Sequence, residues 1–376
     1  MANLILPIFY LFLPLLAYRL GASVFEIGLV GGASNAVYSF LPYVMGLYSD
    51  KRGTRRIFII SSFAILTAVS VLYVLIANPV ALIATRVLEG VGWAMLWPAM
   101  EAAISNDVSG DSKRSLSIFN LTWSFSAAIG PLVGAVLIFL ISIRFTFVAT
   151  SVLLFGILIL NVFPTFNSDA SKSSVKQESI QYKAILQPSE SNIRPSFYLV
   201  STALAAVSSG VLFTFFSPYA RSIGISILMI GVITFVYGGA RFFVYLLTVR
   251  DKVRSFLLSP SMRRKNVLVS LVLMSVSGLL IMIHDPSGVI YSMAYAVVGV
   301  GYSIIYSVSQ AALVAEATPE KAGKGAGLFE SSIGLGASVG PVLAGLISRG
   351  SLTLPFLLPS LGLVVVLVIL PFLFRK

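Results

Sequence analysis

An arginine and a glutamate lie within one apolar segment, spaced so that a helix would place them beside two tryptophans. In residues 79–104, Arg86, Glu89, Trp93 and Trp97 fall within about 80° of one another on a helical wheel. A charge inside such a segment costs about 2.5–3.5 kcal/mol unless it faces protein or water. The pattern therefore predicts either a hydrated cavity that binds a polar solute or a structural Arg86–Glu89 pair at i,i+3.

Similar polar and aromatic stripes follow other apolar segments. Tyrosines share one face of residues 287–314, and Arg241 lies among tyrosines and threonines in residues 226–248. Packing is the commoner role of such stripes, but the charges among them favour a wet cavity. The predicted cavity residues are Tyr10, Arg86, Glu89, Trp93, Trp97, Tyr237, Arg241, Tyr295, Tyr302 and Tyr306.

Two buried acidic residues are candidates for carrying a proton. Burial favours the neutral form of Glu89 and the nearby Arg86 favours its charged form, so solute or conformation would decide between them. Glu330 is the second candidate, and it is expected at a depth where Arg241 would pair with it. A structural salt bridge is the favoured interpretation of that second pair.

Composition excludes most enzyme classes. Of 376 residues 57% are apolar and only 11% are charged, and the chain has no Cys and one His. Thiolate and multi-His metal sites are therefore excluded, and neither a phosphate-binding Gly-rich loop nor a Ser–His hydrolase pattern is present. We expect no enzyme activity, no cofactor and no metal.

Twelve segments are long and apolar enough to cross a bilayer as helices. They are residues 3–19, 24–48, 57–77, 79–104, 115–141, 143–163, 196–218, 226–248, 266–283, 287–314, 325–348 and 352–374. If both termini are cytoplasmic, twenty of the 26 Lys and Arg residues fall on the cytoplasmic side and four outside. The sequence predicts a multi-pass plasma-membrane protein in that orientation, with its basic clusters facing lipid headgroups rather than nucleic acid.

The chain divides into two similar halves. Residues 166–195 are rich in Ser and charge and predict a cytoplasmic linker between bundles at 1–165 and 196–376. Gly130–Pro131 matches Gly340–Pro341 at an offset of 210, and residues 79–104 match 287–314 at 209. The expected fold is all-α, with two pseudo-symmetric six-helix bundles.

A motif after the second segment makes the predicted type of membrane protein more specific. Residues 46–56 (GLYSDKRGTRR) resemble the G-x-x-x-D-[RK]-x-G-[RK]-[RK] signature of the major facilitator superfamily, with Thr54 at a basic position. Arg86–Gly92 is similar to the family's R-x-x-Q-G-x-G pattern, with Glu89 in place of Gln. Ser126–Gly134 is similar to its G-x-x-x-G-P-x-x-G antiporter pattern, with Ser126 in place of Gly.

The resemblance implies roles for two further sets of residues. A cytoplasmic gate that latches the halves together would use Gly46, Asp50, Lys51, Gly53, Arg55, Arg56, Asp107 and Arg114. The basic members of that set are also explained as topology anchors. Close helix packing would use Gly130, Pro131, Gly134, Gly340 and Pro341.

The expected function is secondary transport of a small organic solute by alternating access, coupled to protons. The aromatic lining and the antiporter pattern lean towards efflux, whereas two intramembrane arginines lean towards an anionic solute. The expected partners are the solute, protons and the lipid bilayer, and the expected state is a monomer. The alternatives are a non-transporting solute receptor, an uncoupled facilitator and, least favoured, a membrane enzyme.

Overall fold

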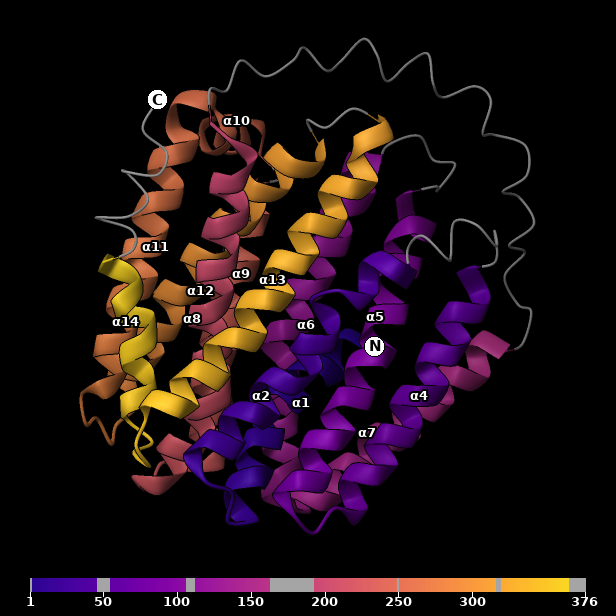
Figure 1. Cartoon of the computed structure of the whole chain (residues 1–376), viewed down its shortest axis with the longest axis vertical. Helices are drawn as coiled ribbons and strands as arrows, with labels where there is room; N and C mark the ends of the chain where they lie inside the picture. Colours follow the sequence, from indigo (N-terminus) through magenta and orange to yellow (C-terminus); the bar gives the residue numbers. More distant parts are fainter. Residues whose placement is uncertain are drawn as a thin grey trace.

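A computed structural model describes residues 2–45, 55–105, 112–162, 193–248, 250–315 and 319–364 (Figure 1). All regular secondary structure in these ranges is helical, and each of the twelve expected segments contains a helix. Among the described residues, ten helices are long and apolar enough to span a membrane, and the shorter Asn3–Arg19 is also apolar. The α-helices are α1 (Ala2–Arg19), α2 (Val24–Tyr38), α4 (Arg55–Leu75), α5 (Pro79–Ser105), α6 (Ser112–Leu140), α7 (Ile143–Val162), α8 (Pro195–Ser222), α9 (Ile227–Thr248), α10 (Asp251–Leu258), α11 (Pro260–Met282), α12 (Val289–Gln310), α13 (Pro319–Ile347) and α14 (Leu357–Val364).

The helix ends differ from the sequence expectation where polar residues extend a helix beyond its apolar part. Residues 251–258 form α10, and α11 already begins at Pro260 rather than at residue 266. Pro260 occupies the first turn of α11, where its missing N–H leaves no hydrogen bond unmade. Hydropathy alone does not predict these helical residues, because their basic side chains lower the mean hydropathy of the segment.

The turns that begin α2 and α9 repeat each other. Gly21 and Gly224, 203 residues apart, adopt φ angles of +78° and +88°, which glycine tolerates best. Ser23 then caps α2 by accepting a hydrogen bond from the Glu26 backbone N–H at 3.3 Å. Ser226 caps α9 by accepting from the Met229 N–H at 3.2 Å. We call the end of the bundle that carries these two turns the short-loop end, and the opposite end, where α7 finishes and α8 begins, the linker end.

Close helix contacts repeat at the same offsets. A methyl group added at Gly90 would lie 2.5 Å from the Ser34 carbonyl oxygen, and one added at Gly299 would lie 2.5 Å from the Tyr237 carbonyl oxygen. Gly130 approaches the Leu4 carbonyl of α1, as Gly340 approaches Val207 of α8. The α2–α5 and α1–α6 packing of the first half therefore recurs as α9–α12 and α8–α13 in the second.

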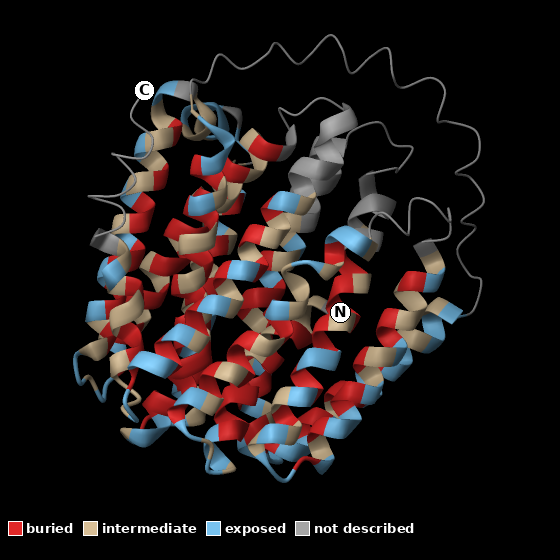
Figure 2. Ribbon diagram, viewed as in Figure 1, coloured by how far each residue is buried: buried red, intermediate tan, exposed pale blue. Residues whose placement is uncertain are grey.

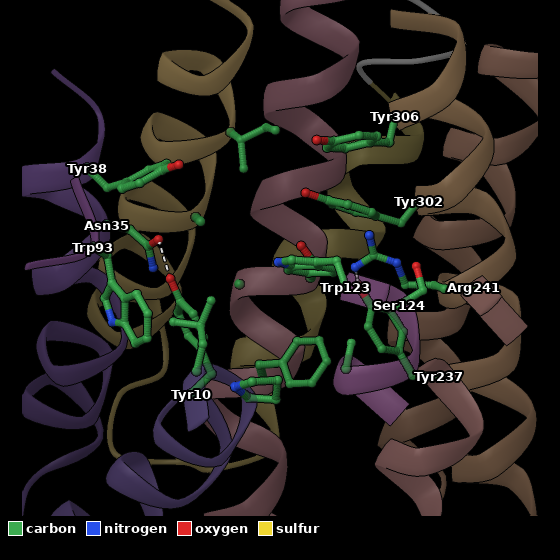
Figure 3. Close-up of a pocket in the computed structure, with 18 of the residues that line it drawn as sticks. Tyr10, Asn35, Tyr38, Trp93, Trp123, Ser124, Tyr237, Arg241, Tyr302 and Tyr306 are labelled. Carbon is green, nitrogen blue, oxygen red and sulfur yellow. Dashed lines mark hydrogen bonds between the residues drawn. The ribbon is translucent and has the colours of Figure 1, made fainter. Parts of the chain in front are cut away.

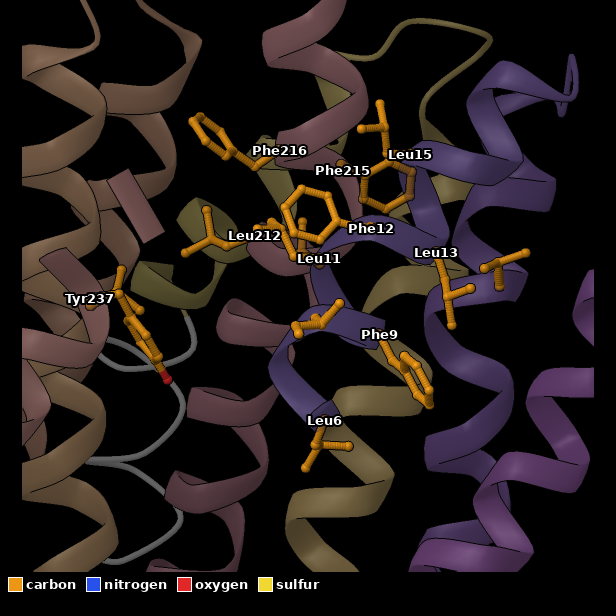
Figure 4. Close-up of a cluster of buried hydrophobic side chains, with 14 of the residues drawn as sticks. Leu6, Phe9, Leu11, Phe12, Leu13, Leu15, Leu212, Phe215, Phe216 and Tyr237 are labelled. Carbon is orange, nitrogen blue, oxygen red and sulfur yellow. The ribbon is translucent and has the colours of Figure 1, made fainter. Parts of the chain in front are cut away.

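The two halves also pack against each other, through α1 with α8, α2 with α13 and α6 with α9. In Figure 4, Leu11, Phe12 and Leu15 of α1 gather with Leu212, Phe215 and Phe216 of α8, and all six are buried. Figure 2 shows buried residues between the helices and exposed ones outside. Large apolar side chains such as Leu75, Phe139 and Leu160 are exposed, as a lipid-facing surface requires.

Adjacent glycines on α9 give a matched test of the α6–α9 interface. In Gly238→Ala, the new methyl group would lie 2.3 Å from the Ala128 Cα atom, whereas in Gly239→Ala nothing lies within 4 Å. Both changes gain the same helix propensity, so only the steric effect differs. We expect Gly238→Ala to lower stability by about 1–3 kcal/mol, the usual cost of overpacking, and Gly239→Ala to leave it unchanged or raise it. Thermal unfolding of both purified variants in detergent measures the difference, and equal midpoints would contradict the described interface.

Candidate functional site

A cavity of about 200 Å³ lies at the centre of the bundle (Figure 3). Four helices of each half line it, α1, α2, α5 and α6 from the first and α8, α9, α12 and α13 from the second. The lining residues are Leu6, Pro7, Tyr10, Gly31, Ser34, Asn35, Tyr38, Trp93, Trp97, Asn120, Trp123, Ser124, Ala127, Ser209, Gly210, Phe213, Thr214, Tyr237, Arg241, Tyr245, Tyr302, Tyr306, Glu330, Ile333 and Ala337. The cavity is therefore built equally from both halves.

Its wall keeps its aromatic character at equivalent positions in the two halves. Trp93 and Trp97 of α5 stack with ring centroids 5.9 Å apart, and Tyr302 and Tyr306 of α12 stack at 6.3 Å. These pairs are related by the offset of 209.

The charges break the symmetry. Arg241 lies 203 residues after Tyr38, and Glu330 lies 210 after Asn120. Both charged residues among the described lining groups therefore belong to the second half, whereas the first half presents neutral polar groups at the equivalent positions.

Arg241 is almost fully buried and is surrounded by aromatic rings. Its guanidinium carbon lies 4.4 Å from the Trp123 ring centroid and 4.8 Å from that of Tyr302. Nη1 donates a hydrogen bond to the Tyr237 hydroxyl at 3.1 Å, and Nε has no hydrogen-bond partner. Tyr245 also hydrogen-bonds to the Arg241 side chain, and the rings stabilise the positive charge without a carboxylate partner.

Glu330 lines the cavity and accepts a hydrogen bond from the Tyr38 hydroxyl at 3.3 Å. This contact joins α13 to α2, across the two halves. The pair expected between Glu330 and Arg241 is not formed, since the ion pair found within the described ranges joins Arg86 to Glu89. Sequence reasoning estimated only the depth of each residue, and depth does not determine the direction in which a side chain points.

The placement of Arg86 and Glu89 also differs from the expected one. Both are buried and neither lines the cavity. Arg86 Nη1 donates to the Glu89 carboxylate at 2.6 Å, and Glu89 also accepts from the Tyr73 hydroxyl and from Trp93 Nε1. The structure therefore shows the structural pair that was the alternative interpretation. Tyr295 lies outside the cavity wall too, with its hydroxyl donating to the Leu212 carbonyl at 3.2 Å.

The structure places the other expected cavity residues in the wall. These are Tyr10, Trp93, Trp97, Tyr237, Arg241, Tyr302 and Tyr306. Tyr10 donates to Asn35 Oδ1 at 2.8 Å, which links α1 to α2 (Figure 3). Asn35, Tyr38, Asn120, Trp123 and Phe213 also line the cavity and were not predicted from the sequence. Applying the offsets of 203 and 210 would have found Tyr38 from Arg241 and Asn120 from Glu330.

Much of the expected gate lies outside the described residues. The structure does not describe positions 46–54, which include Gly46, Asp50, Lys51 and Gly53, or position 107. It also does not describe the side chains of Arg55 and Arg114. Arg56 donates to the carbonyl oxygens of Asn161 and Val162, at 3.2 and 2.9 Å, and so caps the end of α7. Within the described ranges no group of three or more His, Cys, Asp or Glu residues could hold a metal.

The expected packing residues lie at close helix contacts. A methyl group at Gly134 would lie 2.7 Å from Phe12 Cε2, and one at Gly28 would lie 2.5 Å from the Pro341 carbonyl oxygen. Pro131 and Pro341 both lie inside their helices, α6 and α13.

Comparison with known proteins gives a family and a fold. A family model described as Major Facilitator Superfamily matches residues 2–262 and 257–376. No similar curated protein was found. A mutant form of the nucleoside transporter NupG has a TM-score of 0.77 and 14% identity, over 99% of this chain and 98% of that one. A bacterial homolog to the human lysosomal transporter Spinster, in an inward-facing and occupied conformation, has a TM-score of 0.71 and 15% identity, over 99% and 93%.

At these identities the likeness to solved structures concerns the fold. The family match, in contrast, extends through both halves and confirms the resemblance seen in the motifs. This chain is therefore a member of the Major Facilitator Superfamily, a family of membrane solute transporters rather than enzymes.

Proposed function

We propose that this chain moves a small organic solute by alternating access and couples that movement to protons. Bundles at 1–165 and 196–376 would rock about the central cavity, joined by a linker at 166–195. The observation that carries the proposal is the cavity itself, to which each half contributes four helices. A site shared in this way is exposed to one side or the other when the halves tilt.

Tight contacts between the halves at the short-loop end support a state closed on that side. A methyl group at Gly231 would lie 2.5 Å from the Ala135 Cβ atom, and the Ser217 hydroxyl donates to the Leu11 carbonyl at 2.6 Å. The distribution of basic residues favours placing both termini in the cytoplasm of a plasma-membrane monomer. The short-loop end would then face outward, and the cavity would be closed to the outside in this state.

Glu330 is the proposed proton carrier. It is the acidic residue among the described cavity-lining groups, and its hydrogen bond to Tyr38 crosses between the halves, so rocking would change its surroundings. Glu89 is less suited, because Arg86, Tyr73 and Trp93 all donate to its carboxylate away from the cavity. A carboxyl group that exchanges its proton during transport must instead reach water.

Proteoliposomes test the transport proposal. Labelled uridine and labelled benzoate, a neutral and an anionic ring compound, are added with and without an imposed pH gradient, and an enclosed pH-sensitive dye reports proton movement. We expect saturable uptake of at least one probe and a solute-dependent pH change. Uptake without any pH change would leave an uncoupled facilitator, and binding without uptake would leave a receptor. Running the assay from each side distinguishes import from export.

A serine pair on α8 tests the closed end. Ser217→Ala removes the hydrogen bond to α1, whereas Ser201 is a buried serine on the same helix whose Oγ has no hydrogen-bond partner. The chain has no Cys, so a single Ser209→Cys in the cavity wall is a clean reporter. We expect Ser217→Ala to raise thiol labelling from the short-loop side by about 2- to 10-fold, the worth of one hydrogen bond, and Ser201→Ala to leave it unchanged. An equal effect of both changes would show that this contact does not hold the end closed.

A further inference from the structure

Arg241 has a buried N–H donor, at Nε, that no described residue accepts from. A buried arginine normally pairs with a carboxylate, as Arg86 does with Glu89. Arg241 instead contacts aromatic rings and hydrogen-bonds to Tyr237 and Tyr245, and its buried Nε has no partner. A buried donor without a partner is unfavourable, so a ligand that accepts hydrogen bonds from the guanidinium would relieve that cost. Because arginine stays protonated, an anionic acceptor gains most.

The aromatic residues of the cavity wall suit a flat ligand. The Trp93–Trp97 pair has an interplanar angle of 11° and the Tyr302–Tyr306 pair one of 27°. Trp123 adds a third indole to the same wall, directly beside the guanidinium (Figure 3). Aromatic faces pack well against planar rings, so the same cavity offers both a cation and ring surfaces.

The charge balance limits the ligand to one carboxylate. Arg241 is the basic residue among the described lining groups and Glu330 is the acidic one. A second negative charge on the ligand would find no second cation there and would be repelled by a charged Glu330. We infer that the cavity binds a planar organic monocarboxylate, with its carboxylate at Arg241 and its ring against the Trp and Tyr faces. This inference rests on the proposed function only for the idea that the cavity is the solute site.

Tryptophan fluorescence tests the inference directly, because all three tryptophans of the chain, Trp93, Trp97 and Trp123, line the cavity. The purified full-length protein in detergent is titrated with benzoate. Four matched probes follow, each changing one property: benzamide is neutral, benzylamine is cationic, phthalate is a dianion and cyclohexanecarboxylate is not planar. We expect a saturable response to benzoate, with an affinity about tenfold or more above that of every other probe.

Variants assign the preference to Arg241. Arg241→Gln should bring benzoate and benzamide to equal affinity, and Arg241→Lys should keep part of the preference, since lysine retains the charge but not the planar donor geometry. The matched control is Arg349→Gln, an exposed arginine outside the cavity, which should behave as wild type. If Arg241→Gln fails to fold, the five wild-type titrations and Arg241→Lys still decide the question.

The inference would be overturned by equal affinity for benzoate and either benzamide or cyclohexanecarboxylate, by a preference for benzylamine or phthalate, or by no saturable response to benzoate. A preference that survives Arg241→Gln would overturn it as well. Transport fails separately: benzoate binding without flux in proteoliposomes would contradict the proposed function and leave the inferred site standing. Flux of uridine without any carboxylate binding would support the proposed transport and contradict the inferred carboxylate site.

Discussion

Replacing Glu89 with glutamine is expected to destabilise the folded protein by about 3–5 kcal/mol, the usual cost of breaking a buried ion pair. Arg86 is 1% exposed and Glu89 is completely buried. Arginine cannot lose its proton to avoid the burial of its charge, so the change leaves a cation held only by neutral acceptors. One of these is the Val30 carbonyl, which accepts from Arg86 Nε at 2.9 Å.

Thermal unfolding of Glu89→Gln in detergent measures this loss. The matched control is the double variant Arg86→Met/Glu89→Leu, which removes both charges and fills a similar volume. Apolar replacement of a buried pair is often neutral or stabilising, but here the Tyr73 hydroxyl and Trp93 Nε1 lose the acceptor that Glu89 provides. We therefore expect the double variant to recover part of the stability that Glu89→Gln loses. If Glu89→Gln is as stable as the wild type, the pair does not hold α5 against α2 and α4 in the way described.

Replacing Glu330 with glutamine is expected to abolish proton-driven accumulation of solute while exchange of solute across the membrane continues. Glutamine fills the same space and can still accept a hydrogen bond from Tyr38, but it carries no titratable proton. The halves can therefore still move around a bound solute, whereas the pH gradient no longer drives them. The measurement compares uptake under an imposed pH gradient with exchange of labelled for unlabelled solute in proteoliposomes.

Two variants control the Glu330 experiment. Ser332→Ala alters a buried hydroxyl on the same helix, which donates to the Phe329 carbonyl at 2.7 Å, and should preserve both activities. Glu330→Asp keeps the acid and should keep part of the proton-driven uptake. If Glu330→Gln still accumulates solute fully under a pH gradient, Glu330 is not the proton carrier and another acidic residue must carry the proton.

The broad architecture was predictable because a bilayer imposes strong local rules. Every spanning helix needs its own long apolar stretch, so twelve segments could be counted from composition alone, and each contains a helix. Internal similarity was visible for the same reason: Gly130–Pro131 and Gly340–Pro341 are local patterns that close packing requires. The polar beginning of α11 and the short α10 were not predicted, because they lie outside the apolar stretch.

Helical periodicity identified most of the aromatic wall but misplaced its charges. A wheel groups residues by direction around one helix, and Arg86, Glu89 and Trp93 share a broad face of α5. That face is wide enough to meet both the cavity and the neighbouring helices: Trp93 lines the cavity, whereas Arg86 and Glu89 point toward α2 and α4. Tyr295 was misplaced in the same way, because it packs against α8 instead.

The sequence by itself determined the number and apolar character of the spans, the repeat and the family, since these depend on neighbours along the chain. Only the tertiary structure decided which buried charge is paired and which faces the cavity. Arg86 pairs with the carboxylate of Glu89, three residues away on the same helix. Arg241 instead packs against Trp123 of the other half, and Glu330 accepts a hydrogen bond from Tyr38. Trp123 and Tyr38 lie on other helices than Arg241 and Glu330, so those contacts depend on how the helices that line the cavity are packed.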